Sequence, residues 1–173
     1  VIDGLAGVYI DQGRHNEALP LVEQALEIIE SALGPDELDV GVILLNQASI
    51  YYRKGDFTRA IKIFERSLNI HENAIGEPHP RIGRILNDLS NVYRDLGDLS
   101  RALSLLERSL TIYQNIYGSN HPYIPPILHN LASIYRQKGL YEDAEHLIKR
   151  ALAINEKVLG PDHPGTAMTL REL

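Results

Sequence analysis

The stretch that decides the fold is residues 124–164, which read IPPILHNLASIYRQKGLYEDAEHLIKRALAINEKVLGPDHP. Apolar residues in its first part recur at the spacing i, i+1, i+4, i+7 and i+8, which is typical of one face of an α-helix. These residues are Ile127, Leu128, Leu131, Ile134 and Tyr135. A second apolar stripe runs from Ala144 to Leu159. The stretch therefore predicts two helices, one after the other.

Stop signals separate and end these two helices. Gly139 ends the first helix, because glycine enters the left-handed C-cap conformation at low cost. Gly160-Pro161 ends the second, since a proline cannot continue a helix. His163-Pro164 starts another helix, because proline is favoured at the first helical position and keeps the residue before it out of the α region. The unit is a helical hairpin followed by the start of the next one.

The same unit recurs every 42 residues along the whole chain. Four columns of residues keep this step: the glycines that end the first helices, the glycines that end the second helices, a tyrosine and an alanine. They are Gly13, Gly55, Gly97 and Gly139; Gly34, Gly76, Gly118 and Gly160; Tyr9, Tyr51, Tyr93 and Tyr135; and Ala18, Ala60, Ala102 and Ala144. A fixed period of this length is the signature of a solenoid of stacked units. We expect the alanines to let the two helices of each hairpin approach closely.

The repeat predicts an all-α solenoid of antiparallel helical hairpins, in a single domain over residues 1–173. First helices are expected at about 1–12, 38–54, 80–96 and 124–138, and second helices at about 15–33, 57–75, 99–117 and 141–159. The repeats cover about 1–37, 38–79, 80–121 and 122–163, followed by a truncated helix of a fifth repeat at 164–173. Because the chain lacks an initiator Met and its first helix is short, we expect a fragment of a longer protein.

The composition narrows the classes of function. The chain has 173 residues and a net charge of −6, which argues against nucleic acid as the main partner. Cysteine is absent, so disulfides, thiolate metal sites and cysteine catalysis are excluded. No apolar run reaches the roughly 18 residues of a membrane span, and the N-terminus does not resemble a signal peptide. We expect a cytoplasmic protein with no membrane contact.

The motifs of each hairpin resemble the tetratricopeptide signature. The fourth repeat has Leu131-Ala132-x2-Tyr135 followed by Ala144-x3-Ile148, and the third has Leu89-Ser90-x2-Tyr93 followed by Ala102-x3-Leu106. The second repeat departs from the signature at Gln47, where leucine is expected. The 42-residue period, with its Leu-Gly-Pro-Asp-His-Pro linker at 159–164, resembles the kinesin light chain and nephrocystin-3 class of this family.

This resemblance implies an α-α superhelix whose concave groove, lined by the first helices, binds a peptide or a partner protein. It implies a scaffold rather than an enzyme, without a cofactor. The groove positions of the family, carried onto this chain, are Ser49, Tyr52, Arg53, Arg84, Asn87, Asn91, Arg94, His129, Ser133, Arg136, Gln137 and Arg171. Asparagine can clamp the amide groups of an extended peptide, and arginine can form paired hydrogen bonds with a carboxylate.

The charges of the expected groove favour an acidic partner. Its arginines outnumber the acids Asp88 and Asp95 over the same repeats, although the whole chain is acidic. We therefore predict an acidic peptide as the ligand, with Arg84, Asn87, Asn91, Arg94 and Arg136 as anchors. These residues could also simply be solvated.

Charge also varies along the chain. Residues 1–42 carry nine acids and one base, whereas residues 43–84 carry four acids and seven bases. This is either ordinary surface variation or a field that orients a partner or favours end-to-end stacking. A self-assembling array, joined through exposed faces of the terminal repeats, is therefore the alternative function, and an enzyme is a distant third.

The motifs of common catalytic and metal sites are absent from the sequence. There is no Walker loop, dinucleotide fingerprint or nucleophile elbow. His71-Glu72 begins a zincin-like string, but Ile75 occupies the position of the second histidine. His79, His121 and His163 share one column, and each lies in a different repeat, so capping by a residue before proline explains them better than a metal site. The acids Glu142, Asp143 and Glu145 are expected to form a solvated convex face.

Overall fold

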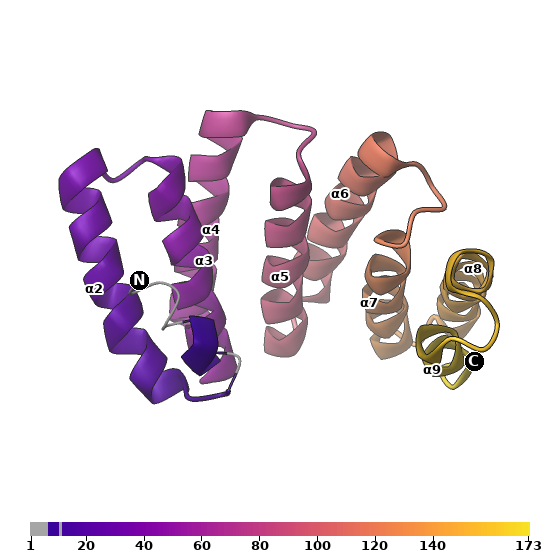
Figure 1. Cartoon of the computed structure of the whole chain (residues 1–173). Coiled ribbons are helices and arrows are strands. Elements are labelled where there is room, and N and C mark those ends of the chain that lie inside the picture. The colour runs from indigo at the N-terminus through magenta and orange to yellow at the C-terminus, as the bar shows by residue number, and fades with distance from the viewer. Residues whose placement is uncertain (1–6, 11) are drawn as a thin grey trace. The chain divides into compact units, whose positions relative to one another are not determined.

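The computed structural model describes residues 7–10 and 12–173, and the chain divides into two compact units, Val1–Glu77 and Pro78–Leu173 (Figure 1). Over the described residues the regular structure is helical, with no strand. None of these helices is long and apolar enough to cross a membrane. The boundary between the units lies in the linker before Pro80, where the sequence predicts the start of a repeat.

In the first unit, the structure describes three helices in full: α2 (His15–Leu33), α3 (Leu38–Arg53) and α4 (Phe57–Ile75). Helices α3 and α4 form a hairpin, and α2 packs against α3. The prediction of helices at 15–33, 38–54 and 57–75 is confirmed, with α3 ending one residue early. The helix expected at 1–12 lies partly outside the described residues, of which 7–10 are helical.

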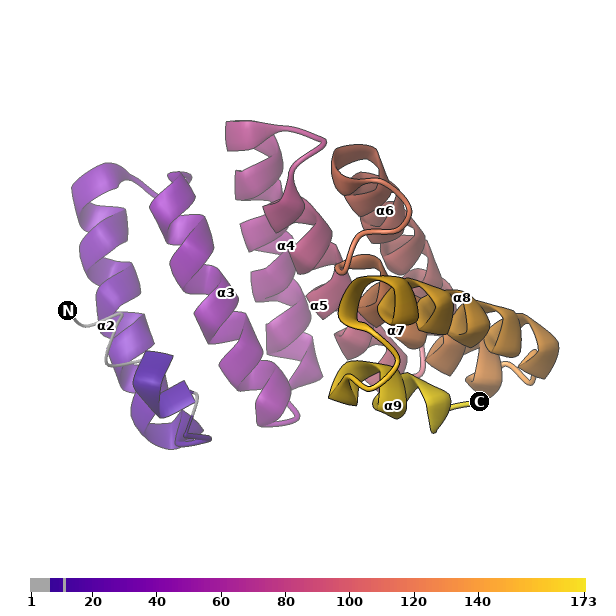
Figure 2. The same cartoon turned by 45° about the vertical axis from the view of Figure 1, so that its right-hand side comes forward.

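The second unit contains two hairpins and a short final helix. They are α5 (Pro80–Leu96) with α6 (Leu99–Tyr117), α7 (Ile124–Gln137) with α8 (Tyr141–Leu159), and α9 (Pro164–Leu170). Figure 2 shows α9 beside α8, near the C-terminus. These bounds confirm the helices predicted at 80–96, 99–117, 124–138, 141–159 and from 164, with α7 ending one residue early.

Second helices are uniform in length and first helices are not. Helices α2, α4, α6 and α8 each have 19 residues, whereas α3, α5 and α7 have 16, 17 and 14. Each second helix begins two residues after a glycine with positive φ and ends directly before another, whereas the first helices α3, α5 and α7 begin four to six residues after theirs. At Gly97, after a first helix, φ is 89° and ψ is 0°, the left-handed conformation that favours glycine.

The linker histidines cap helices at two of their three positions. His79 Nδ1 accepts a hydrogen bond from the backbone N–H of Arg81, and His163 Nδ1 accepts one from Gly165. His121 Nδ1 accepts from the backbone N–H of Tyr123, but α7 begins only at Ile124. Here the histidine closes a turn before the helix, so the capping prediction is wrong in detail for His121.

Small residues allow close packing inside the hairpins. The alanine column is buried in each unit, with Ala60 and Ala102 fully inaccessible to solvent. In α5/α6, a Cβ added to Gly83 would lie 2.7 Å from Cε2 of Tyr113, and in α3/α4 one added to Gly41 would lie 2.8 Å from Cε1 of His71. A side chain at either glycine would therefore push the facing ring aside.

Candidate functional site

The first helices of the second unit, α5, α7 and α9, carry most of the predicted groove residues, and we call their shared polar surface the first-helix face. Side-chain hydrogen bonds connect them in order. Asn130 Nδ2 on α7 donates to Asn87 Oδ1 on α5 at 2.9 Å. On the other side of α7, His129 Nε2 lies 3.1 Å from Thr169 Oγ1, and His129 Nδ1 lies 3.0 Å from Glu172 Oε2. The helices of this face are therefore linked by polar contacts as well as by their apolar sides.

Arg94 lies at the centre of a hydrogen-bonded cluster on α5. Its Nη1 donates to Asn91 Oδ1 at 2.9 Å, and its Nε and Nη2 donate to Asp95 Oδ1 at 3.0 and 2.9 Å. The Arg94 side chain is 20% exposed. A guanidinium has five N–H donors, and three are used here. The cluster fixes the orientation of the Arg94 side chain and leaves two of its N–H donors available to a ligand.

The other arginines of the face also have acidic neighbours. Arg84 Nε lies 3.7 Å from Asp88 Oδ2, and Arg136 Nη2 lies 3.9 Å from Glu172 Oε2. The Arg84 side chain is 75% exposed and the Arg136 side chain 45% exposed, so these long contacts are weak. The count of groove charges in the sequence omitted Glu172, which reaches α7 only through the tertiary fold. The positive excess of the face is therefore smaller than the sequence predicts.

Two hollows lie next to each other on this face, and Pro126 lines both. The smaller has a volume of about 150 Å³ and is lined by Arg84, Asn87, Tyr113, Tyr123, Pro126 and Ile127. The larger has about 370 Å³ and lies between α7 and α9, with His129, Met168, Thr169 and Glu172 in its wall. Apolar walls with a few polar groups are typical of surfaces that hold side chains of a ligand.

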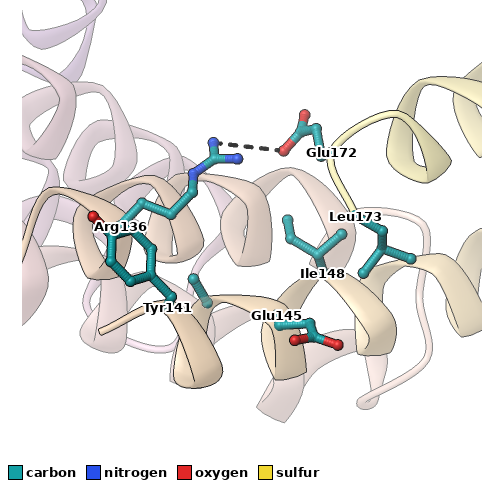
Figure 3. Close-up of a pocket in the computed structure, with 7 residues that line it drawn as sticks. Arg136, Tyr141, Glu145, Ile148, Glu172 and Leu173 are labelled. Carbon is teal, nitrogen blue, oxygen red and sulfur yellow. Dashed lines mark ion pairs between the residues drawn. The ribbon is translucent and has the colours of Figure 1, made fainter. Parts of the chain in front are cut away.

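A third hollow, of about 210 Å³, lies where the chain end meets α7 and α8 (Figure 3). Arg136 and Glu172 face each other across it, and Ile148 and Leu173 line its apolar side. On its rim, Glu145 pairs with Lys149 at 2.5 Å, and this hydrogen bond lowers the pKa of the Glu145 carboxyl below its ordinary value. The hollow therefore has an apolar floor and is lined by charged groups of both signs.

Within the second unit, the structure brings together part of the predicted groove. Arg84, Asn87, Asn91, Arg94, His129 and Arg136 lie on the first-helix face described above. Ser133 is half-buried, and Gln137 and Arg171 are exposed at the ends of α7 and α9. Ser49, Tyr52 and Arg53 belong to α3 of the first unit, where the Tyr52 ring packs 6.0 Å from that of Phe57 and the Arg53 guanidinium lies 6.0 Å from the Tyr52 ring.

Sequence reasoning missed Asn130, Glu172 and the tyrosines of the smaller hollow. The tyrosines did leave a signal, since Tyr113, Tyr117 and Tyr123 fall within eleven residues around the junction of the third and fourth repeats. Asn130 left none, because its pairing with Asn87 depends on how α7 packs against α5. Burial, and then neighbouring Tyr117, raise the pKa of the Tyr113 hydroxyl above its ordinary value.

Residues 7–10 and 12–173 contain no cluster of three histidine, cysteine, aspartate or glutamate side chains placed to hold a metal ion. The acids Glu142, Asp143 and Glu145 of α8 are exposed, as predicted.

The geometry alone defines a class of protein. It is a repeat protein of stacked helical hairpins with a polar face along their first helices. The family model described as tetratricopeptide repeat matches residues 1–68, 39–115, 91–154 and 123–173. The chain belongs to the tetratricopeptide repeat family, whose members are generally non-catalytic scaffolds for protein interactions.

Solved structures place it near the kinesin light chain type of repeat. Two structures of kinesin light chain-like repeats from Podosopora anserina are 26% identical, with TM-scores of 0.86 and 0.85, and the match covers 99% of this chain and 81% and 82% of those. BtubC (BKLC) from P. vanneervenii is 30% identical with a TM-score of 0.83, over 92% of this chain and 63% of that one. Among curated protein sequences, none matches the chain.

Proposed function

We propose that the first-helix face of the second unit binds an extended or short helical peptide that carries acidic residues. The observation that supports this most is the row of donors formed by Arg84, Asn87, Asn91, Arg94 and Arg136. Asn87 and Asn91 can pair with the amide groups of a peptide backbone, and the arginines can pair with its carboxylates. The proposal needs only the second unit.

The acidic neighbours of the arginines limit the affinity that we expect for the ligand. A ligand carboxylate must compete with Asp88, Asp95 or Glu172 for a guanidinium, so each contact gains less than an isolated arginine would give. Arg94 is the most shielded of the three arginines, and hydrogen bonds to a charged group that is shielded from water are worth about 1.5–3 kcal/mol. We therefore expect Arg94 to be the strongest anchor.

The test is calorimetric titration with the strongest binder from an acidic peptide library. Arg94→Ala should weaken binding by about tenfold, which corresponds to about 1.4 kcal/mol. Asn87→Ala should weaken it less, because Asn87 also pairs with Asn130. Both should retain most of the thermal stability of the parent.

Lys157→Ala is the matched control, since Lys157 is exposed on the second helix α8. Lys62→Ala serves the same purpose on α4, and is a better choice than Arg66→Ala. Arg66 donates to Glu30 Oε1 at 2.6 Å and to the Pro35 carbonyl at 2.9 Å, so its loss would also disturb packing. Normal binding by Arg94→Ala together with lost binding by a second-helix control would place the binding surface on the other side of the repeats.

A second candidate is self-association through terminal repeats, supported by exposed apolar side chains at the chain end. Met168 and Leu170 of α9 and the neighbouring Leu173 are each at least half exposed. Sedimentation at increasing concentration tests this candidate. A mass that rises with concentration, and that Met168→Ser with Leu170→Ser reduces, would support it, and a constant monomer mass would count against it.

A further inference from the structure

The end of α6 and the loop that follows it form an aromatic cluster of Tyr113, Tyr117, His121 and Tyr123. The Tyr117 ring stacks on His121 with centroids 4.5 Å apart, and Tyr123 meets Tyr117 edge-on at 5.4 Å. Tyr123 also meets Tyr113 edge-on at 5.8 Å. Rings at these separations attract one another and hold each other in place. The cluster is therefore a preformed surface rather than a set of independent side chains.

This cluster is open to solvent on one side. Tyr117 is 38% exposed and Tyr123 is 54% exposed, although both are large rings with neighbours to pack against. Tyr113 is tied down by its hydroxyl, which donates to the Pro80 carbonyl at 3.2 Å. An ordered aromatic surface that stays partly exposed is typical of an interaction site.

The smaller hollow of the first-helix face opens between this cluster and α5. Its polar lining is rich in donors: Arg84 has N–H groups only, and Asn87 already uses its side-chain oxygen to accept from Asn130. What remains to meet a ligand is the Arg84 guanidinium, the Asn87 amide NH2 and the Tyr123 hydroxyl. The complementary ligand offers carbonyl acceptors and an apolar surface, and it brings few N–H donors that would need a partner.

From this we infer that the hollow and the aromatic cluster bind a proline-rich segment in the polyproline II conformation, next to an acidic residue that pairs with Arg84. Proline has no N–H, and the polyproline II backbone makes no internal hydrogen bonds, so its carbonyls are open to these donors. Its rings pack on aromatic side chains, and its stiffness reduces the entropy lost on binding. The inference rests on the proposed function and names the type of peptide that the same face takes.

Other ligands of aromatic surfaces fit less well. A quaternary ammonium group favours the face of an aromatic ring, but here the positive Arg84 lines the same hollow. A nucleic acid strand would stack on the rings, but the chain has a net charge of −6. The combination of donors, rings and one exposed arginine favours the acidic proline-rich peptide.

The experiment compares three synthetic peptides by calorimetric titration against the full chain. The first is a run of prolines followed by two glutamates, the second has alanines in place of the prolines, and the third has glutamines in place of the glutamates. We expect the first to bind and the loss of its prolines to weaken binding by about tenfold or more. The loss of its glutamates should weaken binding by only about a few-fold, because the Arg84 side chain is exposed. No binding of the first peptide, or equal binding of the first and second, would overturn the inference.

Substitutions then locate the site. Tyr123→Ala should weaken the proline peptide by about tenfold, and Tyr123→Phe, which keeps the ring, should weaken it less. Val158→Ala is the control, because Val158 is an exposed apolar side chain of α8 that lines none of the three hollows. Thermal unfolding of each variant separates lost binding from lost folding. If Tyr123→Ala folds and binds normally, the inference is wrong.

The same data distinguish the two proposals. Binding that needs the prolines and Tyr123 but not the glutamates would support the aromatic site for proline, and would count against the acidic residue in both proposals. Binding that needs the glutamates and Arg94 but not the prolines would do the opposite.

Discussion

The hairpins α5/α6 and α7/α8 share one register and one backbone arrangement, but different side chains hold them. In α5/α6, Asp98 Oδ1 accepts a hydrogen bond from the Arg101 backbone N–H at 3.1 Å, and its carboxylate pairs with the Arg101 guanidinium, which lies over the Tyr93 ring. The Ser109 hydroxyl donates to the Gly83 carbonyl at 2.7 Å. These contacts fasten α6 to α5.

In α7/α8 the equivalent positions are Leu140, Asp143, Ala151 and Pro125. Leu140 has no polar group to cap α8, Asp143 carries the wrong charge to pair as Arg101 does, and Ala151 has no hydroxyl. This hairpin instead uses contacts with the next helix: Asn155 Nδ2 donates to Thr169 Oγ1 at 3.0 Å. The comparison teaches that buried small and apolar columns define the repeat, and that polar contacts add stability in a manner each repeat can vary.

The strongest test of this view is to break a column that both hairpins share. Ala102→Leu and Ala144→Leu should each destabilise the second unit by about 1–3 kcal/mol or more, because the extra atoms have no space where the helices approach. The free energy of unfolding from denaturant titration measures this. Ser104→Leu, on the exposed side of α6, should change it little. An unchanged stability of either alanine variant would contradict the close-packing argument.

A smaller effect is expected from the contacts that differ. Asp98→Ala should cost about 1 kcal/mol, the usual value for the loss of an N-cap. Transplanting the pair into the other hairpin, as Leu140→Asp with Asp143→Arg, should raise stability by a similar or smaller amount. Leu140→Asp alone should gain less, because the new carboxylate would lie near Asp143. Thermal melts of the three variants decide whether the pair is transferable.

The buried serine contact should contribute about as much as the Asp98 cap, and not more, because the Gly83 carbonyl can retain its helical hydrogen bond. Ser109→Ala should cost about 0.5–1.5 kcal/mol, the net value of a typical hydrogen bond. Ser104→Ala is the control on the same helix. A larger loss for Ser109→Ala would mean that the hydroxyl also positions Tyr113, which faces Gly83.

The smallest effect concerns the exposed pair Glu145–Lys149 on α8. The hydrogen bond to Lys149 lowers the pKa of Glu145 below its ordinary value of 4.5. The folded protein therefore binds fewer protons at this carboxyl than the unfolded chain does. The small stabilisation is present above pH 4.5 and is lost as the pH falls through the lower pKa of the folded protein. Glu145→Gln should therefore lose stability less steeply below pH 4.5. The test measures the stability of the parent and of Glu145→Gln as the pH is lowered. Two curves that superimpose would contradict this prediction.

Helix positions were predictable because their signals are local. Gly97, Gly139 and the linker prolines each fix a boundary through the backbone, and the apolar stripes fix which side is buried. The candidate site was less predictable, because its pairings are tertiary. The contacts of Glu172 with Arg136 and His129 join residues that are far apart in the sequence, and no pattern in the repeat announces them.

The count of groove charges was incomplete for the same reason. Counting Asp88 and Asp95 captured acids on the same helix as Arg84 and Arg94, whereas Glu172 lies beyond the end of α9. A count of charges made repeat by repeat cannot include a residue that contacts an earlier repeat only in the folded protein.

The constant 19-residue length of α2, α4, α6 and α8 has a consequence for how such a chain can change. Each second helix acts as a spacer of fixed size, whereas the first helices, which carry the polar face, differ in length and sequence. New recognition surfaces can therefore arise by altering the exposed residues of α5 or α7, while the second helices keep their length. By the same logic, duplication of a whole 42-residue module should lengthen the array and leave its neighbours undisturbed.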